Sequence, residues 1–147
     1  MKPDVDQILN QSAGQLLGTI APLLPTGYAQ GTTSLLAFMM LMSAQEYERA
    51  ADIRAIENAE IRALFAELGP LADSGLRARL SEAAATKDNS LRISTLNAAN
   101  DELRRLLIVL QAHLEERPGA GARDAERRIW QVLKATAQRR LVRLPAG

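Results

Sequence analysis

Residues 32–68 constrain the fold more than any other stretch, because they run without a single glycine or proline. Most of them are good helix formers, so we predict one long helix here. At a rise of 1.5 Å per residue this helix is about 55 Å long, which exceeds the width of a domain of this size. Other helices must therefore lie along it.

The rest of the chain divides into shorter segments with helical spacing. Apolar residues recur every three or four positions, and no stretch alternates as a strand does. Pro22, Pro25 and Gly27 mark a turn before the long helix, and Gly69 and Pro70 end it. We predict helices over residues 3–21, 74–85, 91–117 and 123–141. The fold class is therefore all-α, a five-helix bundle built along one long central helix (about 32–68), and residues 1–147 form a single helical domain.

Helix caps follow from the same punctuation. Thr32, Thr33 and Ser34 offer hydroxyl groups at the start of the long helix, where side-chain oxygens accept from unpaired backbone N–H groups. Asp73 or Ser74 is placed to do the same for the helix over residues 74–85.

Composition limits the class and compartment of the protein. The chain has 147 residues, of which 47% are hydrophobic and 24% charged, as expected for one globular domain. It has no cysteine, which excludes disulfides and thiolate metal sites. The longest unbroken apolar run, residues 35–42, is far shorter than the ~20 residues that span a membrane. The N-terminus lacks a signal-peptide pattern, so we expect a cytoplasmic protein with no membrane contact.

Charge is distributed unevenly along the chain. Residues 1–68 hold four bases and eight acids, a net charge of −4, whereas residues 118–147 hold seven bases and two acids, a net charge of +5. We predict that arginines of the last helix pair with acids of the first half. Nucleic-acid binding through the basic C-terminal helix is an alternative, but the bases are spread around the helix and only Trp130 is available to stack. We therefore do not expect a nucleic-acid partner.

Three carboxylates fall on the apolar side of the long helix. With successive residues 100° apart, Glu46, Glu57 and Glu60 share the side of Ile53, and Arg54 flanks it. A buried carboxylate must be paired, bound to a metal or protonated. Three interpretations stay open. Arg49, Arg54 or an arginine of another helix pairs with the carboxylates, or this half of the helix is exposed, or the carboxylates line a ligand or metal pocket.

The helix over residues 91–117 has polar residues in the same kind of position. Asn100 lies at the centre of its apolar stripe, with Asn97 and Arg104 beside it. Facing the long helix, these side chains would hydrogen-bond Glu57 or Glu46. Two interpretations stay open, a polar contact that fixes the helix register and a substrate site. The candidate ligand-binding residues are Glu46, Arg54, Glu57, Asn97, Asn100 and Arg104.

The chain has few of the residues that form common catalytic and metal sites, with one histidine and no cysteine. His113 is the only histidine, and the helical spacing places it on the solvent side. A di-iron bundle needs Glu-x-x-His on two helices, and a Ser-His-Asp triad would depend on His113 alone. We expect no catalytic residue, no metal and no cofactor.

Residues 35–42 read LLAFMMLM and are apolar over more than half the circumference of the helix. Such a segment is either buried at the centre of the bundle, or it forms a dimer interface or a flexible hydrophobic pocket, because methionine repacks easily. We predict a homodimer through this start of the long helix. The favoured function is a non-catalytic interaction or accessory protein that binds a protein partner, and the alternative is a small-molecule-binding or enzymatic bundle that uses the polar residues above.

Overall fold

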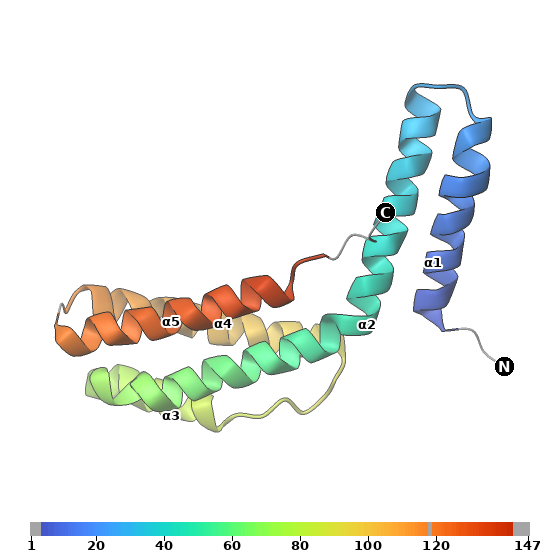
Figure 1. Ribbon diagram of the computed structural model, residues 1–147. Coiled ribbons are helices and arrows are strands. Elements are labelled where there is room, and N and C mark those ends of the chain that lie inside the picture. The colour runs from blue at the N-terminus through green and yellow to red at the C-terminus, as the bar shows by residue number, and fades with distance from the viewer. Residues whose placement is uncertain (1–3, 118, 143–147) are drawn as a thin grey trace. The chain divides into compact units, whose positions relative to one another are not determined.

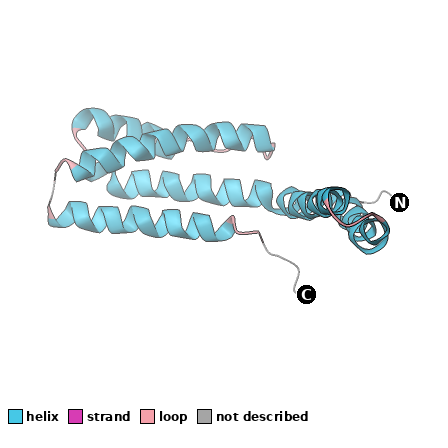
Figure 2. Cartoon of the chain, turned by 90° about the horizontal axis from the view of Figure 1, so that it is seen from above, coloured by secondary structure: helices cyan, strands magenta, loops and turns pink. Residues whose placement is uncertain are grey.

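The computed structural model describes residues 4–117 and 119–142, and all regular structure in them is helical (Figures 1 and 2). The predicted all-α fold with one long central helix is confirmed. None of the described helices combines the length and the apolarity that crossing a bilayer requires. The five α-helices are α1 (Val5–Gln15), α2 (Tyr28–Leu68), α3 (Ser74–Ala85), α4 (Ile93–Glu115) and α5 (Ala120–Arg139).

Helix α2 begins four residues earlier than predicted. Its first residue is Tyr28, directly after Gly27, whose φ of 122° lies in the region that favours glycine. The hydroxyls of Thr33 and Ser34 each donate at 3.0 Å to the carbonyl four residues earlier. The prediction that they cap the helix is wrong, because the turn at Gly27 already starts it and the hydroxyls then lie inside it.

The first predicted helix is divided into three kinds of turn. Helix α1 is followed by a π-helical turn, Leu16–Ile20, and a 3₁₀ turn, Ala21–Leu23. Pro22 has no N–H and its ring clashes with the carbonyl four residues earlier, so the α-helical ladder cannot continue through it. Residue 3 of this prediction lies outside the described residues. The other three predicted helices are confirmed, with ends shifted by at most three residues.

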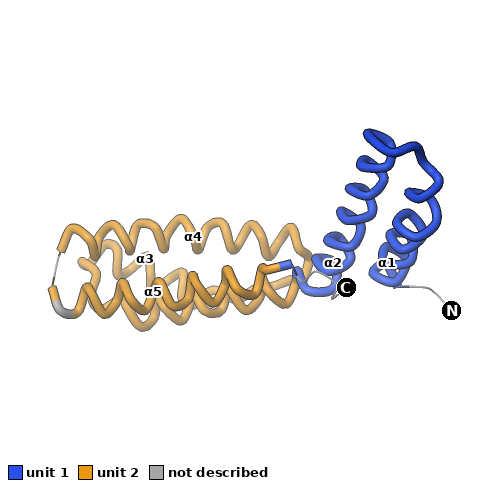
Figure 3. Tube along the Cα trace, turned by 45° about the horizontal axis from the view of Figure 1, so that its top comes forward, with its two compact units in different colours: residues 1–50, 142–147 blue, residues 51–141 orange. Residues whose placement is uncertain are grey.

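The chain divides into two compact units (Figure 3). Unit 1 comprises residues 1–50 and 142–147, and unit 2 comprises residues 51–141. We call the described helical part of unit 1, residues 4–50, the hairpin, and residues 51–141 the bundle. The first part of α2 belongs to the hairpin and its second part to the bundle. That both units form one domain stays a prediction.

The bundle has a continuous apolar core between the second part of α2 and helices α3, α4 and α5. The spacing of apolar residues explains it, because each helix presents one stripe of residues three or four apart. The side chain of Asp73 accepts from the N–H of Leu76 at 2.9 Å and fixes the start of α3, as predicted. The buried residues are Ile61, Leu64, Phe65, Leu68, Ala72, Leu76, Leu80, Leu103, Leu107, Leu110, Leu114, Ala122, Ala125, Ile129 and Val132.

The hairpin has a much thinner interior. Its α1 lies beside the first part of α2 (Figure 3), and the amide of Gln30 donates to the carbonyl of Ala21 at 3.3 Å. Its buried residues are all alanines, whereas the larger apolar residues of 35–42 are exposed or half-buried. Of the interpretations of this segment, burial at the centre of the bundle is therefore wrong. The buried residues of the hairpin are Ala13, Ala21, Ala37, Ala44 and Ala50.

Candidate functional site

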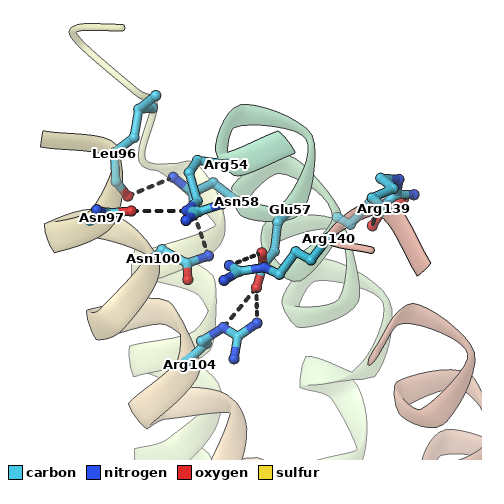
Figure 4. A network of polar contacts seen from close by, with 10 residues as sticks. Arg54, Glu57, Asn58, Leu96, Asn97, Asn100, Arg104, Arg139 and Arg140 are labelled. Carbon is cyan, nitrogen blue, oxygen red and sulfur yellow. Dashed lines mark hydrogen bonds and ion pairs between the residues drawn. The ribbon is translucent and has the colours of Figure 1, made fainter. Parts of the chain in front are cut away.

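Glu57 lies at the centre of the polar cluster in the bundle (Figure 4). It projects from α2 and only 1% of its surface is exposed. Arg104 of α4 donates its Nε–H to Oε1 at 2.7 Å and a second N–H to the same oxygen. Arg140, directly after α5, donates to Oε2 at 2.5 Å. Both oxygens of this buried carboxylate are therefore engaged by guanidinium groups from two other segments.

The charge state of Glu57 follows from these contacts. Burial raises its pKa, but the hydrogen bonds from Arg140 and Arg104 outweigh burial, and the pKa is lowered. Glu57 is thus an anion at neutral pH. A general base needs an oxygen within reach of a substrate proton, and the guanidinium groups occupy both oxygens of Glu57. Its chemistry here is that of an ion pair between helices.

A pair of buried asparagines continues the cluster along α2. Asn58 is 0% exposed and Asn100 of α4 is 4% exposed. The amide of Asn100 donates to Oδ1 of Asn58 at 2.9 Å, and the amide of Asn58 donates to the carbonyl of Leu96 at 3.3 Å and to Asp88 at 3.1 Å. Because a buried amide left unbonded is costly, these contacts select one register of α4 on α2.

Asp88 ties the connection between α3 and α4 to the same helix. Arg62 of α2 donates to both carboxylate oxygens of Asp88, at 2.7 and 3.1 Å, and its Nε–H donates to the hydroxyl of Thr86 at 2.9 Å. These bonds from Arg62 are the main reason why the pKa of Asp88 is lowered. The side chains of Arg62 and Asp88 are only 11% and 14% exposed, so the pair is well shielded from solvent.

Five of the six predicted site residues lie in this cluster. Arg54 donates its Nε–H to Oδ1 of Asn97 at 3.0 Å, next to the contacts of Glu57, Asn100 and Arg104 described above. Glu46 belongs to the hairpin and is exposed. The expectation that it shares a buried face with Glu57 is wrong, because the side of α2 that the bundle covers is uncovered in the hairpin.

The predicted pairing of the last helix with the acidic first half is confirmed. Arg139 donates to both oxygens of Glu60, one of them at 2.7 Å, and this hydrogen bonding raises the pKa of Arg139. Arg128 donates its Nε–H to Glu67 at 3.2 Å. Together with the contact of Arg140, these pairs fasten α5 along the second part of α2.

The helical spacing does not predict two members of the cluster, Asn58 and Arg140. Asn58 escapes it because the buried side of α2 is wider than one stripe. Asn58 lies about 140° from Ile53 around the helix, off the predicted stripe. Phe65 lies seven residues later on the same side and is 1% exposed. Because Phe65 shares a side of α2 with Asn58, its apolar side chain was a sequence signal that this side is buried. No comparable signal marks Arg140, which lies beyond the end of α5.

His113 is not on the solvent side as predicted. Its side chain is 11% exposed, and its Nδ1 lies 3.6 Å from a carboxylate oxygen of Asp73 at the start of α3. The short α3 covers this side of α4, which helical spacing alone could not reveal. The pKa of Asp73 is lowered, first by the N–H of Leu76 and then by the charges of His113 and Arg117. In residues 4–117 and 119–142, no group of three or more His, Asp or Glu side chains is placed to hold a metal ion.

A groove of about 620 Å³ lies elsewhere in the bundle, between α3, the connection after it and α4. None of the six predicted site residues lines it. Its wall combines apolar side chains with side chains of both charges: Ala83, Leu103 and Leu106 with Arg79, Lys87 and Arg105 and with Glu82 and Glu102.

The hairpin carries the most exposed apolar surface that α2 offers. Leu35, Phe38, Met39 and Met42 follow the spacing of a helix seam (i, i+3, i+4, i+7) and are 59%, 39%, 55% and 38% exposed. We call these four residues the hairpin seam. The sequence from residue 7 to residue 45 contains no Asp, Glu, Lys, Arg or His. The seam is therefore free of charged residues over these positions, and the first charged residue that follows it on α2 is the exposed Glu46.

Comparison of the chain with protein-family models, with curated proteins and with solved structures gives no match.

Proposed function

We propose that this is a non-catalytic interaction protein that binds a protein partner through the hairpin seam. The observation that carries the proposal is the exposure of Leu35, Phe38, Met39 and Met42, which lie in a row on a surface free of charge. Contiguous apolar surface of this kind is typical of protein interaction sites. The bundle then serves as the folded body on which the hairpin is carried.

The polar cluster supports a structural role in place of a chemical one. Glu57 accepts hydrogen bonds from Arg104 and Arg140, and Asn58 accepts one from Asn100. The polar atoms of the cluster thus bond to other residues of the bundle. The groove of the bundle lies away from them. We infer that the cluster fixes the register of α2, α4 and α5, as buried polar contacts do in other helical assemblies.

A photoreactive amino acid placed at position 39 tests the proposal in the cells that make the protein. Position 108 is the matched control, because Ile108 is a large apolar residue of α4 with 67% exposure. We expect discrete protein adducts from position 39, and we expect Leu35→Glu to remove them because it puts a charge into the seam. Absence of protein adducts at position 39, or the same adducts from position 108, would contradict the proposal.

The groove supports a second candidate function, the binding of a small amphipathic anion. Its volume of about 620 Å³ lies within the range of small-molecule sites. Arg79, Lys87 and Arg105 would face the anionic group, and Leu103 and Leu106 the apolar part. Titration calorimetry with decanoate should show binding that Arg105→Glu weakens at least about tenfold. No heat of binding with the unchanged protein would remove this candidate.

Nucleic-acid binding receives less support from the geometry. Arg128, Arg139 and Arg140 are each engaged by a carboxylate of α2, which lowers the positive charge that α5 can offer to phosphates. We expect no retention of duplex DNA at low salt, and retention that falls steeply with salt would revive this alternative.

A further inference from the structure

We propose that the partner of the hairpin seam is a second copy of this chain, and that two hairpins pair into a four-helix unit. This inference rests on the proposed function, because it names the partner of the same surface. Its support comes from three features of the hairpin, namely where its large side chains lie, what charge it carries, and how its helices compare with those that bind membranes.

The large side chains of the hairpin lie on the wrong side for a self-sufficient pair of helices. On α2, Ala37 and Ala44 are buried, whereas the seam lies on roughly the opposite side of the helix. Among residues 4–27, only Ala13 and Ala21 are buried. Stable helical architectures bury their apolar stripes between layers, and a second hairpin supplies the missing layer for the seam.

The exposed apolar residues are not confined to α2. Val5, Ile8, Leu17 and Ile20 are 43%, 47%, 42% and 43% exposed. Both helical segments of the hairpin thus have apolar side chains available, which a four-helix arrangement of two hairpins would use and a single docked helix would use only in part.

The absence of charge suits contact between identical surfaces. In a twofold interface the same residues occur on both sides, so a charged residue near the axis would meet its own copy and repel it. Residues 7–45 contain no charged residue. A partner of different sequence is usually matched by complementary charge, and the seam with the rest of positions 7–45 presents none.

A lipid surface fits the hairpin less well. No described helix has the length and apolarity to span a bilayer. Helices that lie in the membrane surface carry lysine and arginine on their polar side, whereas the polar residues between positions 7 and 45 are Asn, Gln, Ser, Thr and one Tyr.

Light scattering of the purified full chain tests the inference. We expect twice the mass of one chain, which is 16.0 kDa, at about 10 µM. Leu35→Glu and Met39→Glu should raise the dimer dissociation constant at least about tenfold, with the helical circular dichroism of the bundle retained. Ile108→Glu adds the same charge at an exposed apolar position of α4 and should leave the dimer intact.

A cysteine cross-link provides a readout that does not depend on a charged substitution. The chain has no cysteine, so Met39→Cys introduces a single thiol. Oxidation should link two copies through Met39→Cys within minutes and should link few through Ile108→Cys. Equal linking of both variants would overturn the assignment of the interface to the hairpin.

The outcomes separate this inference from the proposed function. A mass of one chain up to about 100 µM, with no cross-link through Met39→Cys, would overturn the second copy as partner. If photoreactive position 39 then still gave seam-dependent adducts with a different protein, the proposed function would stand. If it gave no protein adduct at all, both would fall.

Discussion

The hairpin and the bundle use the same helix in opposite ways. In the bundle, the second part of α2 buries large side chains such as Ile61 and Phe65 and engages its charges, Glu57 among them, with other helices. In the hairpin, the first part of α2 buries Ala37 and Ala44 and exposes its seam. One helix therefore has its large apolar side chains buried in its second part and exposed in its first part.

The comparison shows what the charged residues contribute. Each ion pair of the bundle requires that one arginine lies beside one particular carboxylate. The pairs therefore determine which helices are neighbours. The hairpin has no charged residue between positions 7 and 45, so no ion pair can select the neighbour of the seam. It must rely on apolar area and shape, which suits pairing with an identical surface.

The two phenylalanines of the chain give the largest expected difference. Phe65 is 1% exposed in the core of the bundle, and Phe38 is 39% exposed in the hairpin. Phe65→Ala should lower the free energy of unfolding by about 3–5 kcal/mol because it leaves a cavity. Phe38→Ala should lower that of the bundle by less than about 0.5 kcal/mol while weakening self-association.

Urea denaturation followed by circular dichroism measures both variants, and light scattering reports the association. Equal losses of stability would show that the seam is already buried within one chain, and the contrast between hairpin and bundle would then fail.

The two glutamates that the sequence placed together on α2 give the next contrast. Glu57→Gln removes the charge that faces Arg104 and Arg140, so we expect a loss of about 2–3 kcal/mol in the free energy of unfolding. We expect a smaller loss than for a fully buried ion pair, because these arginine side chains are 41% and 35% exposed and can be hydrated. Glu46→Gln changes an exposed residue and should alter stability by less than about 0.5 kcal/mol.

The same denaturation experiment measures both glutamate variants. A loss below about 0.5 kcal/mol for Glu57→Gln would mean that the cluster contributes register alone and little stability, which would weaken its role as the fastening of the bundle.

Acid should act on the bundle before it acts on the uncharged part of the hairpin. The pKa of Glu57 and the pKa of Asp88 are lowered from 4.5 and 3.8. A lowered pKa in the folded state stabilises the protein above the unfolded pKa, and this stabilisation is lost as pH falls through the folded pKa. The free energy of unfolding should thus be steady from pH 7 to about 5 and fall below it.

The pH dependence can be measured by urea denaturation of the unchanged protein and of Glu57→Gln. The variant should show a shallower fall between pH 5 and 3, because one of the responsible carboxylates is gone. The same fall in both proteins would assign the acid sensitivity to other groups.

Much of the bundle could be predicted because its signals are local. Asp73 caps α3, and Pro70 and Gly69 follow the last turn of α2, so these ends follow from the residues themselves. The spacing around Asn100 and Arg104 brought them to Glu57 because a regular helix fixes which residues share a side. Five of the six candidate residues lie together for this reason, and that they bind a ligand stays a prediction.

What escaped prediction depends on which neighbour covers a given side. The hairpin seam and the core residues Ile61 and Leu64 have the same apolar character, yet only the latter are buried. His113 was placed in solvent because the position of the short α3 is not written in the spacing of α4. The helical period gives the direction of a side chain, and tertiary contacts decide what it meets.

The smallest expected effect concerns a buried hydroxyl group of the bundle and whether it has a hydrogen-bond partner. Thr136 of α5 is 3% exposed, and its Oγ1 has no hydrogen-bond partner among the described residues. Because a buried hydroxyl without a partner is costly, Thr136→Val should raise the free energy of unfolding by about 0.5–1 kcal/mol. Thr33→Val in the hairpin is the control, since it removes a hydroxyl that donates to the carbonyl of Ala29, and it should raise nothing. A loss of stability from Thr136→Val would mean that this hydroxyl is satisfied in solution. The bundle would then have no polar defect at this position, and its contrast with the hairpin would become sharper.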